Sequence, residues 1–455
     1  MPSYQELRKS YPEFIYKNYK IEENSERVRL EFQFEIPGLS SFSPYWEFPR
    51  KKGDTASYSQ NGTFHKMAFS LGMVELVSYW KLTCSPLVKV EASRLDQEQI
   101  QWWKDLYFNG LGEFYYTNGI EENIEDFMEI QSAGEETDYP DMPKTDAKGC
   151  LIPVGGGKDS AVTLSLLKES KPQNHCYIIN PRGATLKTAE RAGYGEDQIV
   201  AVKRTLHKNM LELNARGFLN GHTPYSAIVA FSSTIAAYMN GLRYIVLSNE
   251  SSANESTVEG STVNHQYSKS FRFEKAFHDY EKKYIQSNTY YFSMLRPLSE
   301  FQIARYFSRC RQFHDIFRSC NVGSKEDIWC GHCPKCLFVC LILSPFLERE
   351  EICTIFGCDM LNDGNMQKYF DQLIGLEKEK PFECVGSRDE INAAVLLTIE
   401  KLEKEKKELP LLLKHYQETG LYEKNYPYRN QFFTYYDESH LLPEEFLDIL
   451  KKECY

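Results

Sequence analysis

The chain has 455 residues, of which 42% are apolar and 26% are charged. This length exceeds what one hydrophobic core normally supports, and the apolar content excludes a disordered chain, so several folded domains are expected. The formal net charge of −11 at pH 7 argues against a nucleic acid partner, because proteins that neutralise many phosphates normally carry a basic surface.

The N-terminus and the cysteines indicate the compartment. The first residues, "MPSYQELRKSYPEF", lack the apolar segment of a signal peptide, and the longest apolar run, "CLFVCLILSPF", is too short to cross a bilayer. Thirteen cysteines without a secretory signal favour free thiols and a metal site over disulfides. We therefore expect a cytoplasmic protein without a membrane segment. The sequence does not indicate an oligomeric state.

Residues 1–148 are expected to form an α+β domain. The segment 28–36, "VRLEFQFEI", alternates polar and apolar residues and predicts a strand with one buried face. Two amphipathic helices are predicted at 65–81 and 96–116, the second beginning with Asp96 and Gln99 at capping-box spacing. Residues 119–148 are acidic and poor in apolar groups, which indicates a domain boundary or a mobile loop.

Residues 149–345 show a different pattern, in which short apolar segments alternate with amphipathic helices. Strands are predicted at 150–154, 175–180, 198–204 and 243–250. Apolar strands separated by helices are typical of a parallel sheet covered on both faces, which binds ligands at the carboxyl ends of its strands. This part is therefore predicted to be an α/β domain, and the charge-rich residues 346–455 a helical C-terminal region.

The first of these strands runs into three glycines in "CLIPVGGGKDSAVTLSLL", residues 150–167. A strand, a glycine loop and a helix present backbone N–H groups to an anion such as phosphate. Two common phosphate motifs are excluded. Ile152 and Asp159 break G-x-x-x-x-G-K-[ST], and Ser160 stands where G-x-G-x-x-G requires its third glycine.

The loop resembles the S-G-G-x-D-S pyrophosphate loop (PP-loop) of the ATP pyrophosphatases, the adenine nucleotide α-hydrolases with a Rossmann-like sheet of the HUP type. The match lies at Gly156, Gly157, Asp159 and Ser160, whereas Gly155 stands where that family usually has serine. The resemblance implies cleavage of ATP between its α and β phosphates and adenylation of a substrate.

In this interpretation, Gly155 to Gly157 let the chain approach the phosphates and Ser160 donates a hydrogen bond to them. Lys158 would offset charge on the departing pyrophosphate, and Asp159 would hold Mg²⁺.

Other segments agree with a nucleotide site. Asn180 in "INPRG" is expected beside the adenosine, and Asn249 and Glu250 follow a later strand, where Glu250 and Glu255 could contact Mg²⁺. Strand ends also carry Asn and Glu simply as turn residues. The segment 294–307 resembles one that closes many of these sites, and Ser299 is predicted to cap its helix.

Four cysteines follow as C-x₉-C-x₂-C-x₂-C, at Cys320, Cys330, Cys333 and Cys336. Four thiolates can enclose Zn²⁺ in a tetrahedron, so a structural zinc is predicted ahead of an iron–sulfur cluster. His332 is expected to point outward. Cys310 and Cys340 lie on apolar helical stretches, where packing is expected.

Two families of adenylating enzymes remain to be compared. The 7-cyano-7-deazaguanine synthases also combine a PP-loop with a late zinc knot, but they are much shorter and lack counterparts of 1–148 and of the region after 346. The whole chain instead resembles the UDP-N-acetylmuramoyl-L-alanyl-L-glutamate epimerases of peptidoglycan synthesis. The similar segments are 71–86, 102–119, 152–162, 248–256, 263–270, 329–336 and 380–390.

This resemblance implies that ATP adenylates the terminal L-Glu of UDP-MurNAc-L-Ala-L-Glu, a small-molecule substrate. The α-proton is then exchanged, and water releases the D-Glu product with AMP and diphosphate. Candidates for moving the proton are His265, Lys269 and Cys384, although a loop histidine, a solvated lysine and a buried thiol would explain the same residues.

Substrate contacts are less defined. Arg272 or Arg296 could bind the side-chain carboxylate of the glutamate or the UDP, and Lys269 could bind phosphate. Trp46 or Trp80 could stack on uracil, although burial in the core is the default for both. A nucleotide sensor that binds ATP without cleaving it is the non-catalytic alternative.

Overall fold

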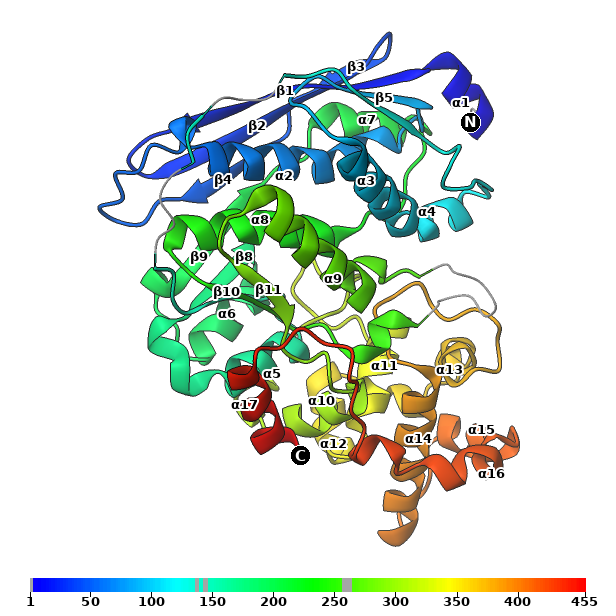
Figure 1. The fold of residues 1–455 in the computed structure, drawn as a ribbon. Helices are drawn as coiled ribbons and strands as arrows, with labels where there is room; N and C mark the ends of the chain where they lie inside the picture. The colour runs from blue at the N-terminus through cyan, green and yellow to red at the C-terminus, as the bar shows by residue number, and fades with distance from the viewer. Residues whose placement is uncertain (1–2, 136–138, 142–145, 256–263) are drawn as a thin grey trace.

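The computed structural model describes residues 3–135, 139–141, 146–255 and 264–455. Parts of the acidic loop predicted at 119–148 therefore lie outside the described residues. Within the described residues, eleven strands form one sheet in the order β11-β10-β7-β8-β9-β4-β2-β1-β5-β6, with β3 beside β2 (Figure 1). The strands are β1 (Glu13–Glu23), β2 (Arg27–Ile36), β3 (Ser40–Phe42), β4 (Tyr45–Pro49), β5 (Leu87–Val90), β6 (Glu129–Ser132), β7 (Cys150–Pro153), β8 (His175–Ile179), β9 (Ile199–Arg204), β10 (Tyr244–Leu247) and β11 (Tyr290–Ser293).

The N-terminal part of the sheet packs on a buried helix. Strand β2 alternates between buried and partly exposed residues, which confirms the strand predicted at 28–36. The helix predicted at 65–81 is α2 (Gly62–Trp80), but it is buried on nearly every side rather than amphipathic, because it lies between β1 and β2 on one side and α8 (Tyr225–Asn240) on the other. The capping box of Asp96 and Gln99 is present at the start of α3 (Gln97–Gly110), which is followed by α4 (Gly112–Thr117).

Strands β7 to β10 form the predicted parallel part of the sheet, and β11, which the sequence did not predict, adds a fifth parallel strand. Numbered along the chain as 1 to 5, they lie in the order 3-2-1-4-5, so the order reverses between β7 and β10. Alternate residues enter two different cores: Leu151 and Ile245 face the core shared with the N-terminal part, whereas Ile152 and Val246 face the core of the C-terminal helices. Sheets of this order bind ligands outside their carboxyl ends at the point of reversal.

Helices cover both faces of these strands. Helices α8 and α9 (Phe271–Tyr280) lie on the side of the N-terminal part, and α5 (Lys158–Leu166), α6 (Gly183–Arg191) and α10 (Glu300–Phe307) cover other parts of the sheet and its edges. Ser299 caps α10 with a capping box, as predicted. The small helix α7 (Lys208–Ala215) contacts β3, and α1 (Tyr4–Ser10) begins the chain.

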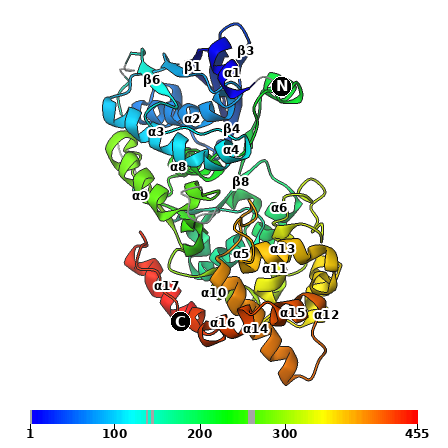
Figure 2. The same cartoon turned by 90° about the vertical axis from the view of Figure 1, so that its right-hand side faces the viewer.

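The C-terminal helices pack at the far end of the molecule from β1 and β2 (Figures 1 and 2). They are α11 (Pro334–Leu343), α12 (Arg349–Phe356), α13 (Gln367–Ile374), α14 (Arg388–Lys404), α15 (Leu411–Glu418), α16 (Leu421–Asn425) and α17 (Glu444–Cys454). The last segment returns to the parallel sheet, where Tyr290 donates a hydrogen bond to the carbonyl oxygen of Leu441 at 3.0 Å. Among the described residues, the helices are all too short or too polar to span a bilayer.

Candidate active site

The glycine loop joins β7 to α5 at the point where the strand order reverses. Gly156 has a φ of 81°, and a Cβ there would lie 3.0 Å from the Cβ of Ala184, so both backbone and space require glycine. Gly155 has open space where a side chain would be, and Gly157 begins α5 in an extended conformation without a side-chain cap. The first N–H groups of α5 are therefore left for another acceptor.

A cavity of about 550 Å³ lies beside this loop, at the carboxyl ends of β7, β8 and β9. Its wall includes Gly155, Asn180, Arg182, Arg318 and Asp327. Asn180 has a φ of 48°, and its side-chain amide binds the backbone of Arg204 through two hydrogen bonds of 2.8 and 2.9 Å. Asn180 thus lines the cavity, while its side chain ties the ends of β8 and β9 together, and its place beside adenosine stays a prediction.

Beyond the glycine loop, Asp159, Glu250 and Glu300 form a carboxylate cluster whose oxygens lie within 4.8 Å of one another. The ammonium of the buried Lys158 bonds both Asp159 and Glu300. Burial alone would raise the pKa of Asp159, but Lys158 holds it below its ordinary value, whereas burial raises the pKa of Glu300 to about 8. Oxygen donors at this spacing fit Mg²⁺.

Three residues predicted for this region have other environments. Glu255 bonds the ammonium of Lys380 and is not part of the carboxylate cluster, where Glu300 is the third member instead. Asn249 donates to the hydroxyl of Ser293 at 3.1 Å. The hydroxyl of Ser160 lies in the first turn of α5 and donates to the carbonyl oxygen of Gly157 at 3.1 Å.

The three residues proposed to move a proton meet at one sulfur. The ammonium of Lys269 lies 3.1 Å from the Sγ of Cys384, and His265 also hydrogen-bonds this cysteine. Burial alone would raise the pKa of Cys384, but Lys269 and His265 lower it to about 6. The thiolate is therefore the main form at neutral pH.

Glu113 of α4 orients the imidazole of His265 by bonding its Nδ1. Burial would lower the pKa of His265, but Cys384 and Glu113 raise it to about 9. The ring of His222 lies beside it, with centroids 4.4 Å apart, and burial followed by the charge of His265 lowers the pKa of His222 to about 4.

This cysteine cluster, defined as Cys384, Lys269, His265 and Glu113, lies beside the carboxylate cluster. The guanidinium of Arg296 donates to the carbonyl oxygens of both Glu250 and Lys269, so it links the two segments. The positive charge of Lys269 also contributes to the lowered pKa of Asp159. The carboxylate cluster and the activated thiol therefore adjoin each other.

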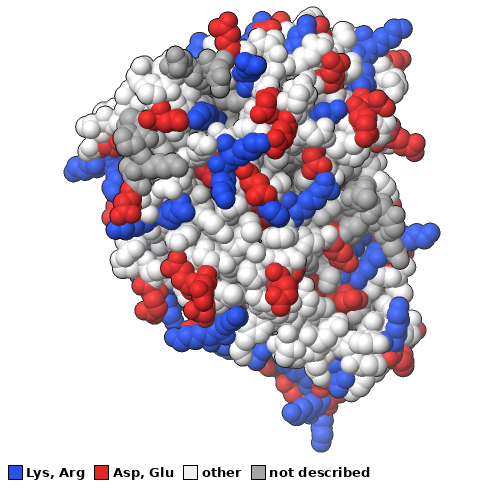
Figure 3. Space-filling view, viewed as in Figure 1, with Lys and Arg blue, Asp and Glu red and all other residues white. Residues whose placement is uncertain are grey.

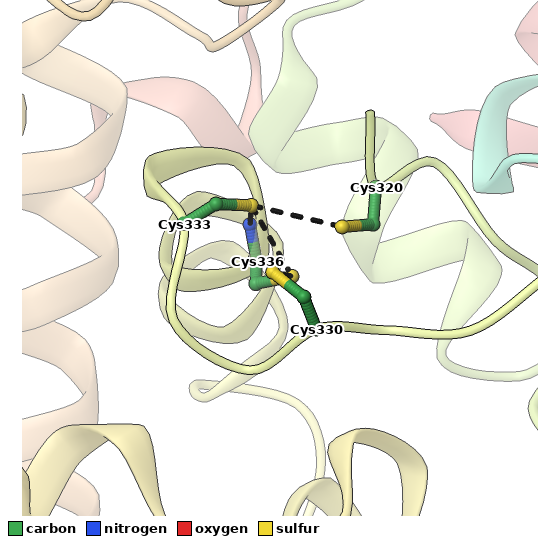
Figure 4. A group of neighbouring side chains, drawn as sticks. All are labelled: Cys320, Cys330, Cys333 and Cys336. Atoms are coloured by element: carbon green, nitrogen blue, oxygen red, sulfur yellow. Dashed lines mark hydrogen bonds between the residues drawn. The ribbon is translucent and has the colours of Figure 1, made fainter. Parts of the chain in front are cut away.

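The four cysteines of the predicted metal site come together (Figure 4). The Sγ atoms of Cys320 and Cys333 are 3.8 Å apart, and Cys336 lies 3.7 Å from Cys330 and 3.5 Å from Cys333. A single ion with Zn–S bonds of about 2.3 Å requires tetrahedral edges of about 3.8 Å, so the geometry fits one zinc better than a multi-iron cluster.

The remaining histidine and cysteines near this site follow the expectations. His332 is exposed and bonds the carbonyl oxygen of Cys330 through Nδ1. Cys310 and Cys340 are buried in the core of the C-terminal helices. Lys335, inside the cysteine turn, is buried and bonds the carbonyl oxygen of Cys384, so the turn also reaches the cysteine cluster.

Of the four suggested substrate contacts, three are fully buried, and the fourth, Arg272, is exposed and ion-paired. Arg296 is fully buried and paired with Glu274 at 2.8 Å, and Arg272 bonds Asp105 on the surface. Trp46 and Trp80 are fully buried, where their indole N–H groups donate to Glu75 and to the carbonyl oxygen of Ser85. Both tryptophans are core residues rather than stacking surfaces for uracil.

The structure adds Glu113, Glu300 and Lys335 to the site. Each had a weak signal in the sequence: Glu300 directly follows the predicted cap Ser299, Lys335 lies between two cysteines of the predicted metal site, and Glu113 lies in a segment used for the family resemblance. Nothing in their spacing shows that they converge, because they come from three different parts of the chain.

Comparison with known proteins identifies the family. The model of the MurL N-terminal domain matches residues 5–294, and the model of the MurL C-terminal domain matches residues 313–424. The chain belongs to the MurL family. These models meet between 294 and 313, and the domain boundaries at 148 and 345 remain predictions.

Two MurL relatives cover most of this chain. The UDP-N-acetyl-alpha-D-muramoyl-L-alanyl-L-glutamate epimerase of Xanthomonas oryzae pv. oryzae is 34% identical over 344 residues, which are 73% of this chain and 74% of the relative. The protein of the same name from Salinispora tropica is 35% identical over 333 residues, 72% of each chain. No solved structure matches this MurL chain.

Proposed function

We propose that this protein is an ATP-dependent epimerase that converts the terminal L-Glu of UDP-MurNAc-L-Ala-L-Glu to D-Glu in peptidoglycan biosynthesis, acting in the cytoplasm. The names of its MurL relatives support the substrate and the inversion. The meeting of Cys384, Lys269 and His265 beside the carboxylate cluster carries the proposal, because it combines a phosphate site with groups that can move a proton.

The nucleotide part of the proposal is a PP-loop ATPase with a Rossmann-like sheet. The triphosphate would lie on Gly155 to Gly157 and the N-terminus of α5, and the adenosine in the cavity lined by Asn180. Asp159, Glu250 and Glu300 would hold Mg²⁺, which supplies positive charge to the phosphates when bound. Lys158 would turn its ammonium toward the departing pyrophosphate.

Adenylation explains how an unactivated amino acid can lose its α-proton. Removing that proton from a free carboxylate would create a dianion, whereas an acyl-adenylate delocalises the new charge as an enolate. In the proposed reaction, the α-carboxylate attacks the α-phosphorus of ATP and pyrophosphate leaves. A group of the cysteine cluster takes the α-proton, another proton returns to the opposite face, and water releases the product and AMP.

Release of pyrophosphate with three sets of reactants tests this function against its alternatives. We expect release with ATP and UDP-MurNAc-L-Ala-L-Glu, together with D-Glu in the product and deuterium at its α-carbon in D₂O. Release only with carboxydeazaguanine and ammonia would support the deazaguanine synthase alternative, and release with neither would support the nucleotide sensor. Accumulation of ADP and inorganic phosphate in place of AMP would contradict the proposed cleavage.

Asp159→Asn should abolish pyrophosphate release, because the amide removes a charged ligand of Mg²⁺ while keeping the size of the side chain. The fold should be retained, since Asp159 is partly exposed and its neighbours in α5 pack without it. Pyrophosphate release and circular dichroism measure the two effects. Asp146→Asn, at an exposed surface carboxylate, is the control, and substantial activity of the Asp159 variant would reject the metal role.

A further inference from the structure

Cys384, His265 and Glu113 form the arrangement of an activated thiol. Glu113 bonds Nδ1 of His265, and the same imidazole bonds Cys384. Glu113 comes from α4, His265 from the segment before α9, and Cys384 from the segment between α13 and α14. A nucleophile, a base and a carboxylate that orients the base define nucleophilic catalysis on unrelated folds. A cysteine that served only to pack would not need this alignment.

We propose that Cys384 is the nucleophile of a covalent step, in which it takes the glutamyl group from the acyl-adenylate and carries it as a thioester during inversion. The inference rests on the proposed function, because it requires the adenylate as the acyl donor. It assigns the proton transfers to the two groups that contact the same sulfur, Lys269 and His265.

The balance of basicity and nucleophilicity favours this role over that of a base. The pKa of Cys384 is lowered from an ordinary value near 9 to about 6, which weakens the thiolate as a base toward a carbon-bound proton. When the pKa of a thiol is lowered, the nucleophilicity of its thiolate decreases only about half as steeply, on a logarithmic scale, as its basicity. The lowered pKa therefore weakens Cys384 more as a base than as a nucleophile. It also keeps nearly all of the sulfur in the reactive thiolate form at neutral pH.

The covalent step conserves atoms and electrons. An electron pair of Sγ forms the S–C bond, and the C–O bond to AMP breaks, with AMP leaving as the anion. The α-proton passes to one neighbouring group and the electrons enter the thioester enolate, and a proton then returns to the opposite face. Water finally adds to the carbonyl, the S–C bond breaks, and the thiolate and the free D-Glu carboxylate are restored.

Acylation of Cys384 would also prepare Lys269 as a base. The negative sulfur is the main charge that opposes the effect of burial on Lys269: burial lowers the pKa of Lys269, and Cys384 followed by Glu250 raises it. A thioester has no charge on sulfur, so the half-buried ammonium of Lys269 loses its nearest partner and releases its proton more readily. Formation of the acyl-enzyme would thus create the base at the place where the α-carbon arrives.

Trapping the acyl-enzyme tests the proposal directly. The full-length protein is mixed with ATP, Mg²⁺ and UDP-MurNAc-L-Ala-L-Glu, quenched in acid at times from milliseconds to seconds, and examined by mass spectrometry. We expect an added mass equal to the substrate minus one water, on the peptide that contains Cys384, and its removal by hydroxylamine. Cys358→Ala, at an exposed thiol, should keep the adduct.

Cys384→Ala separates the steps. It should keep the ATP–pyrophosphate exchange of adenylation, lose the adduct, and slow AMP release by roughly 1,000-fold or more. Cys384→Ser, checked by thermal unfolding, provides a second variant that keeps the shape of the side chain.

Two results would overturn the thioester. The first has two parts that must occur together. The wild-type enzyme turns over but shows no adduct at any quench time, and the Cys384→Ala variant loses α-proton exchange but still releases one AMP per pyrophosphate. The other is full epimerisation by Cys384→Ala. Absence of ATP–pyrophosphate exchange in the wild type would instead reject the adenylation itself, and the thioester with it.

Discussion

At the scale of single residues, the site depends on burying charges that compensate one another. Burial disfavours both a thiolate and an ammonium, yet Cys384 and Lys269 lie 3.1 Å apart, and each stabilises the charged form of the other. Lys158 has the same relation to Asp159 and Glu300. Removing one member of such a pair changes the chemistry of its partner more than it changes the shape of the site.

Alkylation of Cys384 should therefore depend on pH with a midpoint near 6. Only the thiolate reacts with iodoacetamide, so the rate should rise as the pH passes through 6 and stay constant above about 7. In Lys269→Met the opposing charge is lost and burial dominates, so the midpoint should move up toward or beyond the ordinary value. The rate is measured by mass spectrometry of the peptide that contains Cys384, between pH 4.5 and 9.5.

The matched control is Lys275→Met, which removes an exposed lysine of α9 that pairs with Asp279 on the surface. It should leave the midpoint unchanged. A wild-type midpoint near 9, or one that Lys269→Met does not move, would contradict the charge pairing described for this thiol.

The sequence could predict those site residues that belong to a local motif. Gly156 could be named because a turn between a strand and a helix needs glycine, and the structure gives it a positive φ and a close neighbour. Glu300 and Glu113 could not be named, because their roles come from contacts across 142 and 152 positions of the chain, with Lys158 and His265. Glu255 lies outside the carboxylate cluster and bonds Lys380 instead, a contact that no local pattern reveals.

At the scale of elements, the cysteine segment between α10 and α11 holds several parts of the site. The backbone N–H of Arg318 donates to the carbonyl oxygen of Gly156 at 2.7 Å, and Asp327 accepts from the N–H of Ala184 at 3.0 Å. Lys335, in the first turn of α11 directly after this segment, reaches Cys384. A metal bound by its four cysteines would therefore fix the glycine loop, the start of α6 and the reactive thiol relative to one another.

The purified protein should contain one zinc per chain, and Cys333→Ser should lose it. Cys333 contributes a buried sulfur that contacts both Cys320 and Cys336, so its loss opens the tetrahedron. We expect pyrophosphate release to fall at least tenfold, because the glycine loop loses its support. Elemental analysis measures the metal, and iron with visible absorbance would indicate a cluster instead.

Cys358→Ser is the control for this experiment. Its exposed sulfur lies 3.8 Å from the carbonyl oxygen of Gly331 but outside the group of four. This variant should keep both metal and activity. A zinc content that Cys333→Ser leaves unchanged would show that the four cysteines are not the ligands.

At the scale of the whole molecule, the N-terminal part and the nucleotide part share one sheet. Antiparallel pairing of Trp46 with Arg204 and of Glu47 with Lys203 joins β4 to β9. The alternation of strands and helices predicted the parallel strands, but it could not predict this junction, because β4 and β9 lie about 150 residues apart and their edges carry no local signal. The surface gives a further general feature: on the face in Figure 3, basic and acidic side chains are intermixed.

A buried ion pair fastens this junction. Glu75 of α2 is fully buried, accepts from the indole of Trp46 at 2.8 Å and binds the guanidinium of Arg204 through two hydrogen bonds of 2.5 and 2.9 Å. Arg204 also lines the cavity proposed for adenosine, and its backbone holds Asn180. The packing of the two parts and the shape of the nucleotide site are therefore coupled through one carboxylate.

Glu75→Ala should lower the free energy of unfolding by about 3–5 kcal/mol, because it leaves the guanidinium of Arg204 buried without its partner. The Michaelis constant for ATP should rise as well, since Arg204 and Asn180 shape the cavity. Urea unfolding and steady-state kinetics measure the two effects.

Glu75→Gln should give an intermediate loss, because its amide oxygen can still accept from Trp46 while the charge is gone. Glu98→Ala, which breaks an exposed ion pair with Lys283, should change stability by less than about 1 kcal/mol. A loss in Glu75→Ala as small as this surface value would mean that the sheet junction does not depend on the buried pair.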